Sequence, residues 1–220
     1  MATVNDENAD ASFPSPYPPR PAAEIANLQQ ALSTLGTERS FHPQDEIYAV
    51  QESGKFIYLF TEGHFSFIRA SDGLVLSSVR GAIIYGIAEN LRPRGGFYLK
   101  AEEPCKALVV PAEEAFALFT REHLWESVAS LLAWFLQIYS LREEHLVGVT
   151  AYVMIRNKLI ELYSQPADLR GEINVADYIQ ERTQLARSTI MAILGELRRG
   201  GYIDIKRGKL LDIKHLPKYY

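Results

Sequence analysis

The stretch NVADYIQERTQLARSTIMAILGELRRGGYIDIKRGKLLDI, residues 174–213, decides the fold of this chain. Asn174 is a favourable cap for a first short amphipathic helix, and a link over residues 181–185 leads into a second helix. Gly200 and Gly201 end the second helix, because glycine is the preferred residue just beyond a helix C-terminus. Two short strands, YIDIK and LLDIK, then pair across a tight turn. Two helices followed by a two-stranded wing predict a winged helix-turn-helix.

The second helix of this segment separates an apolar face from a small, uncharged one. At about 100° per residue, Ser188 and Ala192 project nearly opposite the apolar stripe. Small outward side chains let a helix backbone approach the edges of the bases in the major groove. The opposite stripe belongs to the predicted core and consists of Ile190, Ile193, Leu194 and Leu197. The segment therefore predicts that this helix binds DNA.

Positive charge gathers at the same end of the chain. The net charge of −4 divides into 12 Lys and Arg against 8 Asp and Glu over residues 150–220, and 11 against 19 in the remainder. Cations on a wing neutralise phosphates and so bind DNA without sequence preference. The alternative is an adaptor whose winged helix contacts another regulator, with the same cations merely solvated. The predicted DNA-binding residues are Arg187, Ser188, Thr189, Met191, Ala192, Arg199, Lys206, Arg207 and Lys209.

Short strand-like runs fill the N-terminal half. After an amphipathic helix over residues 22–36, the segment 41–111 carries runs such as KFIYLF and HFSFIRA between glycine-centred turns. Several short strands at regular spacing predict an antiparallel β-roll. The expected fold is α+β and has four parts: a disordered, proline-rich leader over residues 1–21, a sensor-like β-roll domain over 22–122, a long helix with a hinge over 123–148 and the winged helix-turn-helix over 149–220.

The long helix predicted within residues 123–148 has more apolar surface than one neighbouring element can cover. Its middle, SLLAWFLQIYSL, is apolar nearly all round. One face can pack on the roll, and a second copy of the same helix is the simplest cover for the other. A central helix inside a monomer is the alternative. Gly148 follows the helix at a point where the chain can act as a hinge. The homodimer hypothesis assigns the interface to Val128, Leu131, Leu132, Phe135, Ile138, Tyr139 and Arg142.

Composition and residue types exclude several classes of protein. No apolar run reaches the roughly 18–20 residues that cross a bilayer, and the N-terminus has no secretory pattern, so we expect a cytoplasmic protein without a membrane partner. The histidines are scattered, and no catalytic triad or phosphate-loop spacing occurs, so we expect neither an enzyme nor a metal site. No cofactor is expected, since one cysteine cannot hold an iron–sulfur cluster. His42 and His64 are the candidate haem ligands, although lone histidines in strands are usually structural.

Cys105 permits two interpretations. It begins the last apolar run of the roll, CKALVV, beside Lys106, and a neighbouring cation would lower the pKa of the thiol and favour the reactive thiolate. A redox role would then need a partner outside the chain, because the sequence contains one cysteine. The other interpretation is a small buried apolar side chain, which is how free cysteine mostly behaves.

The order of these elements resembles the CRP/FNR superfamily of bacterial transcription regulators, and within it the IprA type (inhibitor of hydrogen peroxide resistance). The likeness is carried by YIQERTQLARSTIMAILGELRRGGYIDIKRGKL (178–210) and HLPKYY (215–220), with support from FLQIYSLREEHLVG (135–148) and YGIAENL (85–91). The resemblance implies a cyclic-nucleotide-binding-like β-roll, a dimerisation helix and a pseudo-palindromic operator in double-stranded DNA. It also implies RNA polymerase as a further partner and a link to oxidative-stress control.

One stretch departs from the superfamily. Its cyclic-nucleotide binders carry a Gly-Glu pair followed by an Arg-Ser or Arg-Thr pair, and the matching stretch here is YGIAENLRPRGGFYLKA (85–101). Ile87 stands where the Glu that binds the ribose would be, and the Arg that binds the phosphate is replaced as well. An apolar residue cannot replace a guanidinium that neutralises a phosphate, so we expect no response to cyclic AMP. Arg92 and Arg94 lie in the same loop and form a candidate anion site, with a solvated basic turn as the alternative.

Overall fold

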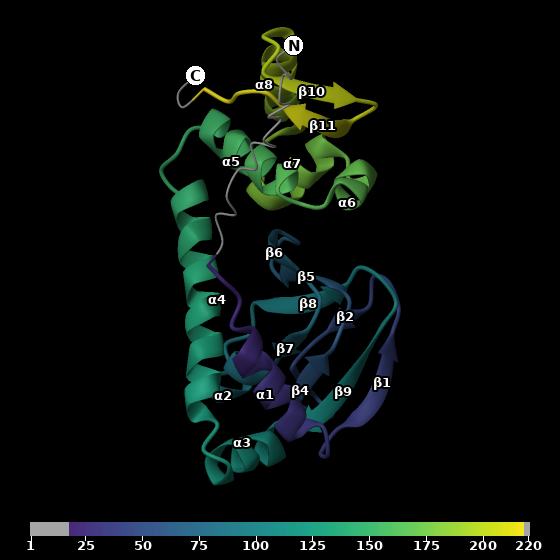
Figure 1. The fold of residues 1–220 in the computed structure, drawn as a ribbon, viewed down its shortest axis with the longest axis vertical. Coiled ribbons are helices and arrows are strands. Elements are labelled where there is room, and N and C mark those ends of the chain that lie inside the picture. The colour runs from purple at the N-terminus through teal and green to yellow at the C-terminus, as the bar shows by residue number, and fades with distance from the viewer. Residues whose placement is uncertain (1–17, 218–220) are drawn as a thin grey trace, which may run out of the picture. The chain divides into compact units, whose positions relative to one another are not determined.

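The computed structural model describes residues 18–217, which divide into two compact units. The roll unit consists chiefly of residues 18–144, and the C-terminal unit of residues 145–180 and 185–217. The mixed order of helices and strands confirms the α+β prediction (Figure 1). The elements are α1 (Ala22–Leu32), β1 (Thr37–Phe41), β2 (Glu46–Ile47), β3 (Val50–Gln51), β4 (Gly54–Phe60), β5 (His64–Arg69), β6 (Val75–Arg80), β7 (Ile83–Tyr85), α2 (Ile87–Leu91), β8 (Phe97–Ala101), β9 (Cys105–Pro111), α3 (Ala112–Arg121), α4 (Trp125–Leu146), α5 (Ala151–Tyr163), α6 (Ala167–Glu172), α7 (Val175–Thr183), α8 (Arg187–Arg199), β10 (Ile203–Lys206) and β11 (Lys209–Ile213).

Two antiparallel sheets build the roll. One has the strand order β1-β9-β4-β3, with β7 also paired to β4, and the other has the order β2-β8-β5-β6. β4 is the centre of the first sheet, since Tyr58 pairs with Val109 of β9 and with Tyr85 of β7. Aromatic side chains from both sheets share one core, in which the ring centroids of Phe60 and Phe65 lie 4.4 Å apart. The predicted antiparallel roll is confirmed.

β4 is buried on both faces, which explains its continuous apolar run. Side chains alternate across a strand, so Tyr58 and Phe60 point into the core between the sheets. Ile57 and Leu59 point the other way and pack in a second core together with α1, α3 and α4. All four side chains are at most 3% exposed. Figure 1 shows α1, α3 and α4 against this part of the roll. The roll therefore needs these helices to complete its interior.

α4 begins where the sequence placed the long helix. His123 has a left-handed φ of 55°, which separates α3 from α4. One face of α4 is buried, with Val128 and Leu131 each 1% exposed, and the Phe135 ring lies 5.9 Å from that of Phe67 in β5. No single helix among the described residues has the length and apolar character of a membrane span; α3 and α4 reach it only together, bent by 120° at their junction.

Gly86 holds the short helix α2 close to β4. It has a φ of 107°, and a Cβ at this position would lie 2.4 Å from the carbonyl oxygen of Phe56. Asn90 reinforces the contact, because its Nδ2 donates to the carbonyl oxygens of Gly86 at 2.7 Å and of Phe56 at 2.9 Å. A side chain at position 86 would push α2 away from the strand. This close approach fixes the position of the residues on α2.

A separate core holds the C-terminal unit together. It takes side chains from α5, α7, α8 and the β10–β11 hairpin. A buried polar group links two of these helices: Lys158 Nζ lies 2.5 Å from one carboxylate oxygen of Glu161, and Tyr178 Oη donates to the other at 2.7 Å. Each charge is therefore paired, which burial requires. The short helix α6 was not anticipated by the sequence analysis.

Most of the predicted leader, residues 1–17, lies outside the described residues. The rest of it, residues 18–21, contacts the roll unit. Trp134 Nε1 donates to the carbonyl oxygen of Pro18 at 3.2 Å, and Arg20 Nη1 donates to the carbonyl oxygen of Arg80 at 3.0 Å. Pro18 and Arg20 thus make hydrogen bonds to the roll unit that the proline-rich composition did not reveal.

Candidate functional site

The helix-turn-helix consists of α7 and α8. Asn174 caps α7 as predicted, since its Oδ1 accepts hydrogen bonds from the backbone N–H groups of Ala176 at 3.0 Å and Asp177 at 3.3 Å. α7 continues to Thr183, so the link is shorter than the expected 181–185. Gln184 opens the turn with a left-handed φ of 60°, which redirects the chain into α8.

α8 presents its small residues outward. Its apolar stripe is buried, with Ile190, Leu194 and Leu197 at most 6% exposed. Met191 is 53% exposed, so its apolar side chain lies on the surface of α8. Of the residues predicted to bind DNA, Thr189 and Lys209 are half-buried, and the others are exposed: Arg187, Ser188, Met191, Ala192, Arg199, Lys206 and Arg207. The structure brings these residues together on α8 and the wing.

Arg187 is held by the preceding helix. Its Nη1 donates to Oδ1 of Asp177 and, at 3.2 Å, to Oε1 of Gln180, both on α7. The pair is about half exposed, so water and salt weaken it. The guanidinium must leave at least one of these partners to contact a base edge or a phosphate. At the other end of α8, Arg199 pairs with Glu196 one turn earlier.

The wing has a tight turn anchored on α7. β10 and β11 pair with Lys206 opposite Lys209, and both turn residues, Arg207 and Gly208, have positive φ, as two-residue hairpin turns require. The carbonyl oxygen of Gly208 accepts from the backbone N–H of Val175 at 2.9 Å. Lys206 and Arg207 point into solvent, whereas Lys209 Nζ donates to the carbonyl oxygen of Glu172 at 2.5 Å and so braces the wing against α6.

A groove of about 260 Å³ lies between the start of α7, α8 and the wing. It contains two of the predicted DNA-binding residues, Arg187 and Met191. It also contains Asn174 and Arg198, which were not among them. The sequence shows Arg198 as a cation next to Arg199, but it does not show which way the side chain points from the last turn of α8. The groove extends the candidate interface beyond the outer face of α8.

The comparison of sequences identifies the family. A family model described as winged helix-turn-helix DNA binding matches residues 151–218. Two curated relatives, each called inhibitor of hydrogen peroxide resistance, come from Salmonella typhimurium strain LT2 and Escherichia coli strain K12. Each is 30% identical over 203 residues, which cover 91% of this chain and 98% of the relative. The chain belongs to this family.

Solved structures place the family within a wider fold. The c-di-GMP responsive global regulator CLP of Xanthomonas campestris superposes with a TM-score of 0.70 at 14% identity, over 84% of this chain and 98% of that one. A transcriptional regulator of the CRP/FNR family from Eubacterium rectale gives 0.65 at 14% identity, over 86% and 90%. The roll, long helix and winged helix-turn-helix are thus the CRP/FNR fold, as predicted. The matching family model assigns DNA binding to residues 151–218, and the solved structures show the fold of the whole chain.

The seven residues that the sequence assigns to the dimer interface are buried or partly covered within the single chain. Val128 and Leu131 are each 1% exposed because they belong to a core of their own roll unit, and Ile138 is 8% exposed. Leu136, which was not predicted, is 65% exposed. Helical periodicity alone could not say which apolar side chains the roll would cover. The remaining predicted residues, Leu132, Phe135, Tyr139 and Arg142, are partly covered. The first three also line a cavity between the roll and α4.

The pKa of Cys105 is raised, whereas the sequence led us to expect a lowered one. Burial, together with the carboxylates of Glu103 and Asp45, raises the pKa of the thiol to about 11. Lys106 does not counteract this effect, because strand alternation turns it away and its Nζ bonds Oε1 of Glu38 at 2.8 Å. The expected lowering of the pKa by Lys106 is therefore wrong, and Cys105 lies among the buried apolar side chains of the roll.

The candidate anion-binding and haem-binding residues of the roll do not gather in one site. Arg92 and Arg94 are exposed and line the outer part of a cavity of about 640 Å³ beside α2. His42 is exposed beside Asp45, and burial lowers the pKa of His64. In the part of the chain that the structure describes, no three His, Cys, Asp or Glu side chains gather as metal ligands would.

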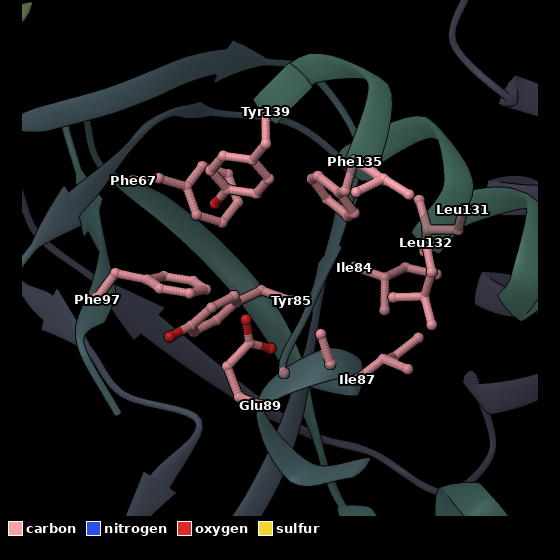
Figure 2. Close-up of a pocket in the computed structure, with 13 residues that line it drawn as sticks. Phe67, Ile84, Tyr85, Ile87, Glu89, Phe97, Leu131, Leu132, Phe135 and Tyr139 are labelled. Carbon is pink, nitrogen blue, oxygen red and sulfur yellow. The ribbon is translucent and has the colours of Figure 1, made fainter. Parts of the chain in front are cut away.

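An apolar cavity of about 230 Å³ opens between the roll and α4 (Figure 2). Ile87, at the position of the ribose-binding Glu of cyclic-nucleotide binders, is 2% exposed and contributes to the wall. Glu89 on α2 is the acidic residue of this wall; burial raises its pKa, and it accepts hydrogen bonds from the backbone N–H groups of Gly86 and of Glu89 itself. Burial and the nearby Glu89 raise the pKa of Tyr139 to about 12.

Replacing Asp177 with Asn should tighten binding to DNA, because it removes the carboxylate that competes for Arg187. We expect a two- to fivefold gain, about the strength of an exposed ion pair. Fluorescence anisotropy with a labelled duplex at fixed salt measures it. Asp204→Asn is the matched control, since Asp204 is exposed on the wing and loses the same charge. An equal gain in both variants, or weaker binding by Asp177→Asn, would contradict release of Arg187.

Cys105 should react slowly with alkylating agents in the folded protein. A thiol pKa of about 11 lowers the thiolate fraction at pH 8 about a hundredfold relative to the usual value of 9. The rate of iodoacetamide labelling, followed by mass spectrometry, should therefore be at least about a hundredfold lower in native than in urea-unfolded protein. The labelling rate of the native protein should rise as the pH approaches 11. Equal rates in the two states at pH 8 would show that the thiol is accessible and acidic.

Proposed function

We propose that the chain is a homodimeric transcription regulator that binds a pseudo-palindromic operator through α8 and the wing. The single observation that carries this proposal is the exposed outer face of α8, which is uncharged over residues 188–195, with cations at both ends of the helix and on the wing. A major groove admits a helix whose outward side chains are small, and the flanking cations position it on the phosphates.

Different residues would have different tasks at the operator. Side chains that point outward from α8 would meet the edges of the bases, and the exposed cations would meet phosphates. Arg187 would do either after leaving Asp177. Lys209 would hold the wing in place through α6. The base-facing set is Ser188, Thr189, Met191 and Ala192, and the phosphate-facing set is Arg199, Lys206 and Arg207, to which the groove adds Arg198.

The exposed face of α4 supplies a surface for the second copy. Ala129, Ala133, Leu136 and Ser140 are exposed and repeat at steps of four, three and four residues. That spacing is the seam of a two-stranded coiled coil, and its small members allow the helices to approach closely. Two copies joined here would present two α8 helices, which matches a pseudo-palindromic site. RNA polymerase is the further partner that this kind of regulator would contact.

A link to oxidative stress rests on the relatives called inhibitor of hydrogen peroxide resistance. The buried, weakly acidic Cys105 argues that such a link would not begin with this thiol. The apolar side chain of Ile87 and the apolar cavity above it argue against cyclic AMP as an effector. We therefore propose a regulator that does not respond to cyclic AMP and takes part in peroxide-resistance control.

The DNA-binding proposal predicts that Ala192→Glu lowers operator affinity by at least about tenfold. The carboxylate would repel phosphates, and the longer side chain would occupy the space between α8 and the bases. Genomic fragments, including the region upstream of the gene, serve as probes in mobility shift at several salt concentrations. Ala167→Glu, an equal change on the exposed start of α6, should bind nearly as wild type. Absence of salt-dependent binding to any fragment would favour an adaptor that contacts another regulator.

The dimer proposal predicts that Leu136→Glu shifts the protein toward the monomer, because it places a charge in the apolar seam. Sedimentation velocity measures the mass directly. Gln137→Glu, a neighbouring exposed position outside the seam, should leave the dimer intact. A wild-type protein that sediments as a monomer at micromolar concentration would contradict the proposal.

A further inference from the structure

We propose that the cavity of the roll binds a small organic ammonium ion whose apolar body is about the size of one aromatic ring. The inference goes beyond DNA binding and does not depend on it. It rests on the size of the cavity, on the aromatic faces that surround it, and on one carboxylate in its wall (Figure 2).

The cavity has room for one ring with a short chain. Its volume is about 230 Å³, whereas an apolar cavity of about 150 Å³ accepts benzene. The wall takes side chains from both layers of the roll and from α4, so a ligand here would be enclosed from several sides. Apart from Glu89 and the two phenol groups, the lining side chains are hydrocarbon, which favours an apolar body over a sugar or a nucleotide.

Aromatic rings form an incomplete box. Phe67 is the ring that contacts three of the others, with its centroid 6.0 Å from that of Tyr85, 6.1 Å from Phe97 and 5.9 Å from Phe135. Tyr139 on α4 adds a fifth ring to the lining. Figure 2 shows these rings around a shared space. The faces of aromatic rings attract cations, and boxes of this kind are used to recognise ammonium groups.

Glu89 supplies the charge that a cation needs. Figure 2 shows its carboxylate rising from α2 into the space beside Tyr85. The backbone N–H groups of Gly86 and Glu89 satisfy part of the carboxylate, and no Lys, Arg or His of the described residues is among the groups that shift its pKa. A carboxylate in an apolar wall is stabilised by a positive ligand group, which forms a charge-assisted hydrogen bond.

An anionic ligand fits the cavity poorly. Among the described residues, none of those that line it is Lys, Arg or His. Arg92 and Arg94 lie in water along the neighbouring, larger cavity, and Arg142 lies one turn beyond Tyr139 without lining either one. Arg142 is close enough for its charge to lower the pKa of Tyr139, but a phosphate or carboxylate inside the cavity would still face Glu89 across a wall that holds no cation. The cavity therefore selects against the charge that a cyclic nucleotide carries.

Isothermal titration calorimetry with three compounds of matched shape tests the proposal. The probes are 2-phenylethylammonium, neutral 2-phenylethanol and anionic 3-phenylpropanoate, each titrated into the full-length protein. We expect the ammonium to bind at least about tenfold more tightly than the alcohol, the usual contribution of a hydrogen bond to a charged group. The anion should bind more weakly than both. Equal or tighter binding of the anion would overturn the proposal, as would absence of binding by the ammonium.

Two variants locate the site. Glu89→Gln keeps an acceptor for the backbone of α2 but removes the charge, and it should abolish the preference for the ammonium over the alcohol. Glu113→Gln, at an exposed position in the first turn of α3, makes the same change elsewhere and should retain the preference. Phe97→Leu leaves Glu89 untouched and should weaken ammonium binding more than alcohol binding. A preference that persists in Glu89→Gln would place the ammonium outside this cavity.

Discussion

The burial of one face of α4 against the roll is the contact on which the rest of the roll unit depends. Val128 and Leu131 close the core formed by α1, α3 and the outer face of β4, and Phe135 packs on Phe67. This contact sets the rotation of the helix about its axis. The rotation in turn decides which side chains complete the core, which line the cavity and which stay exposed. The exposed row of side chains that contains Leu136 is therefore a consequence of how the roll is filled.

The C-terminal unit follows the same logic on a smaller scale. Burial of the α8 stripe leaves the small residues outside, so the surface offered to DNA is defined by the core behind it. The Lys158–Glu161–Tyr178 group holds α5 to α7 and thereby supports the helix that restrains Arg187. The wing is joined to the start of α7 through Gly208. A helix with an exposed face of small residues, a guanidinium paired to the preceding helix and an anchored wing thus come from a short segment.

The sequence was most informative where local periodicity determines structure. The cap at Asn174, the stripe of α8 and the glycine after the helix follow from chemistry within a few residues, and the β-roll follows from strand spacing and glycine turns. The errors arose where distant segments meet. The outer face of α4 depends on what the roll covers, and the pKa of Cys105 depends on carboxylates that the fold brings near. The cavity combines β5, β7, β8, α2 and α4, and no local pattern announces it.

The most direct test of the account is dimethyl sulfate footprinting on the best-bound genomic fragment. The reagent methylates N7 of guanine in the major groove and N3 of adenine in the minor groove. The account predicts two protected clusters of guanine N7, about one helical turn apart, with little change at adenine N3 between them. That pattern requires both a pair of α8 helices and their entry into successive major grooves. A single cluster, or protection confined to adenine N3, would contradict a dimer that reads DNA through α8.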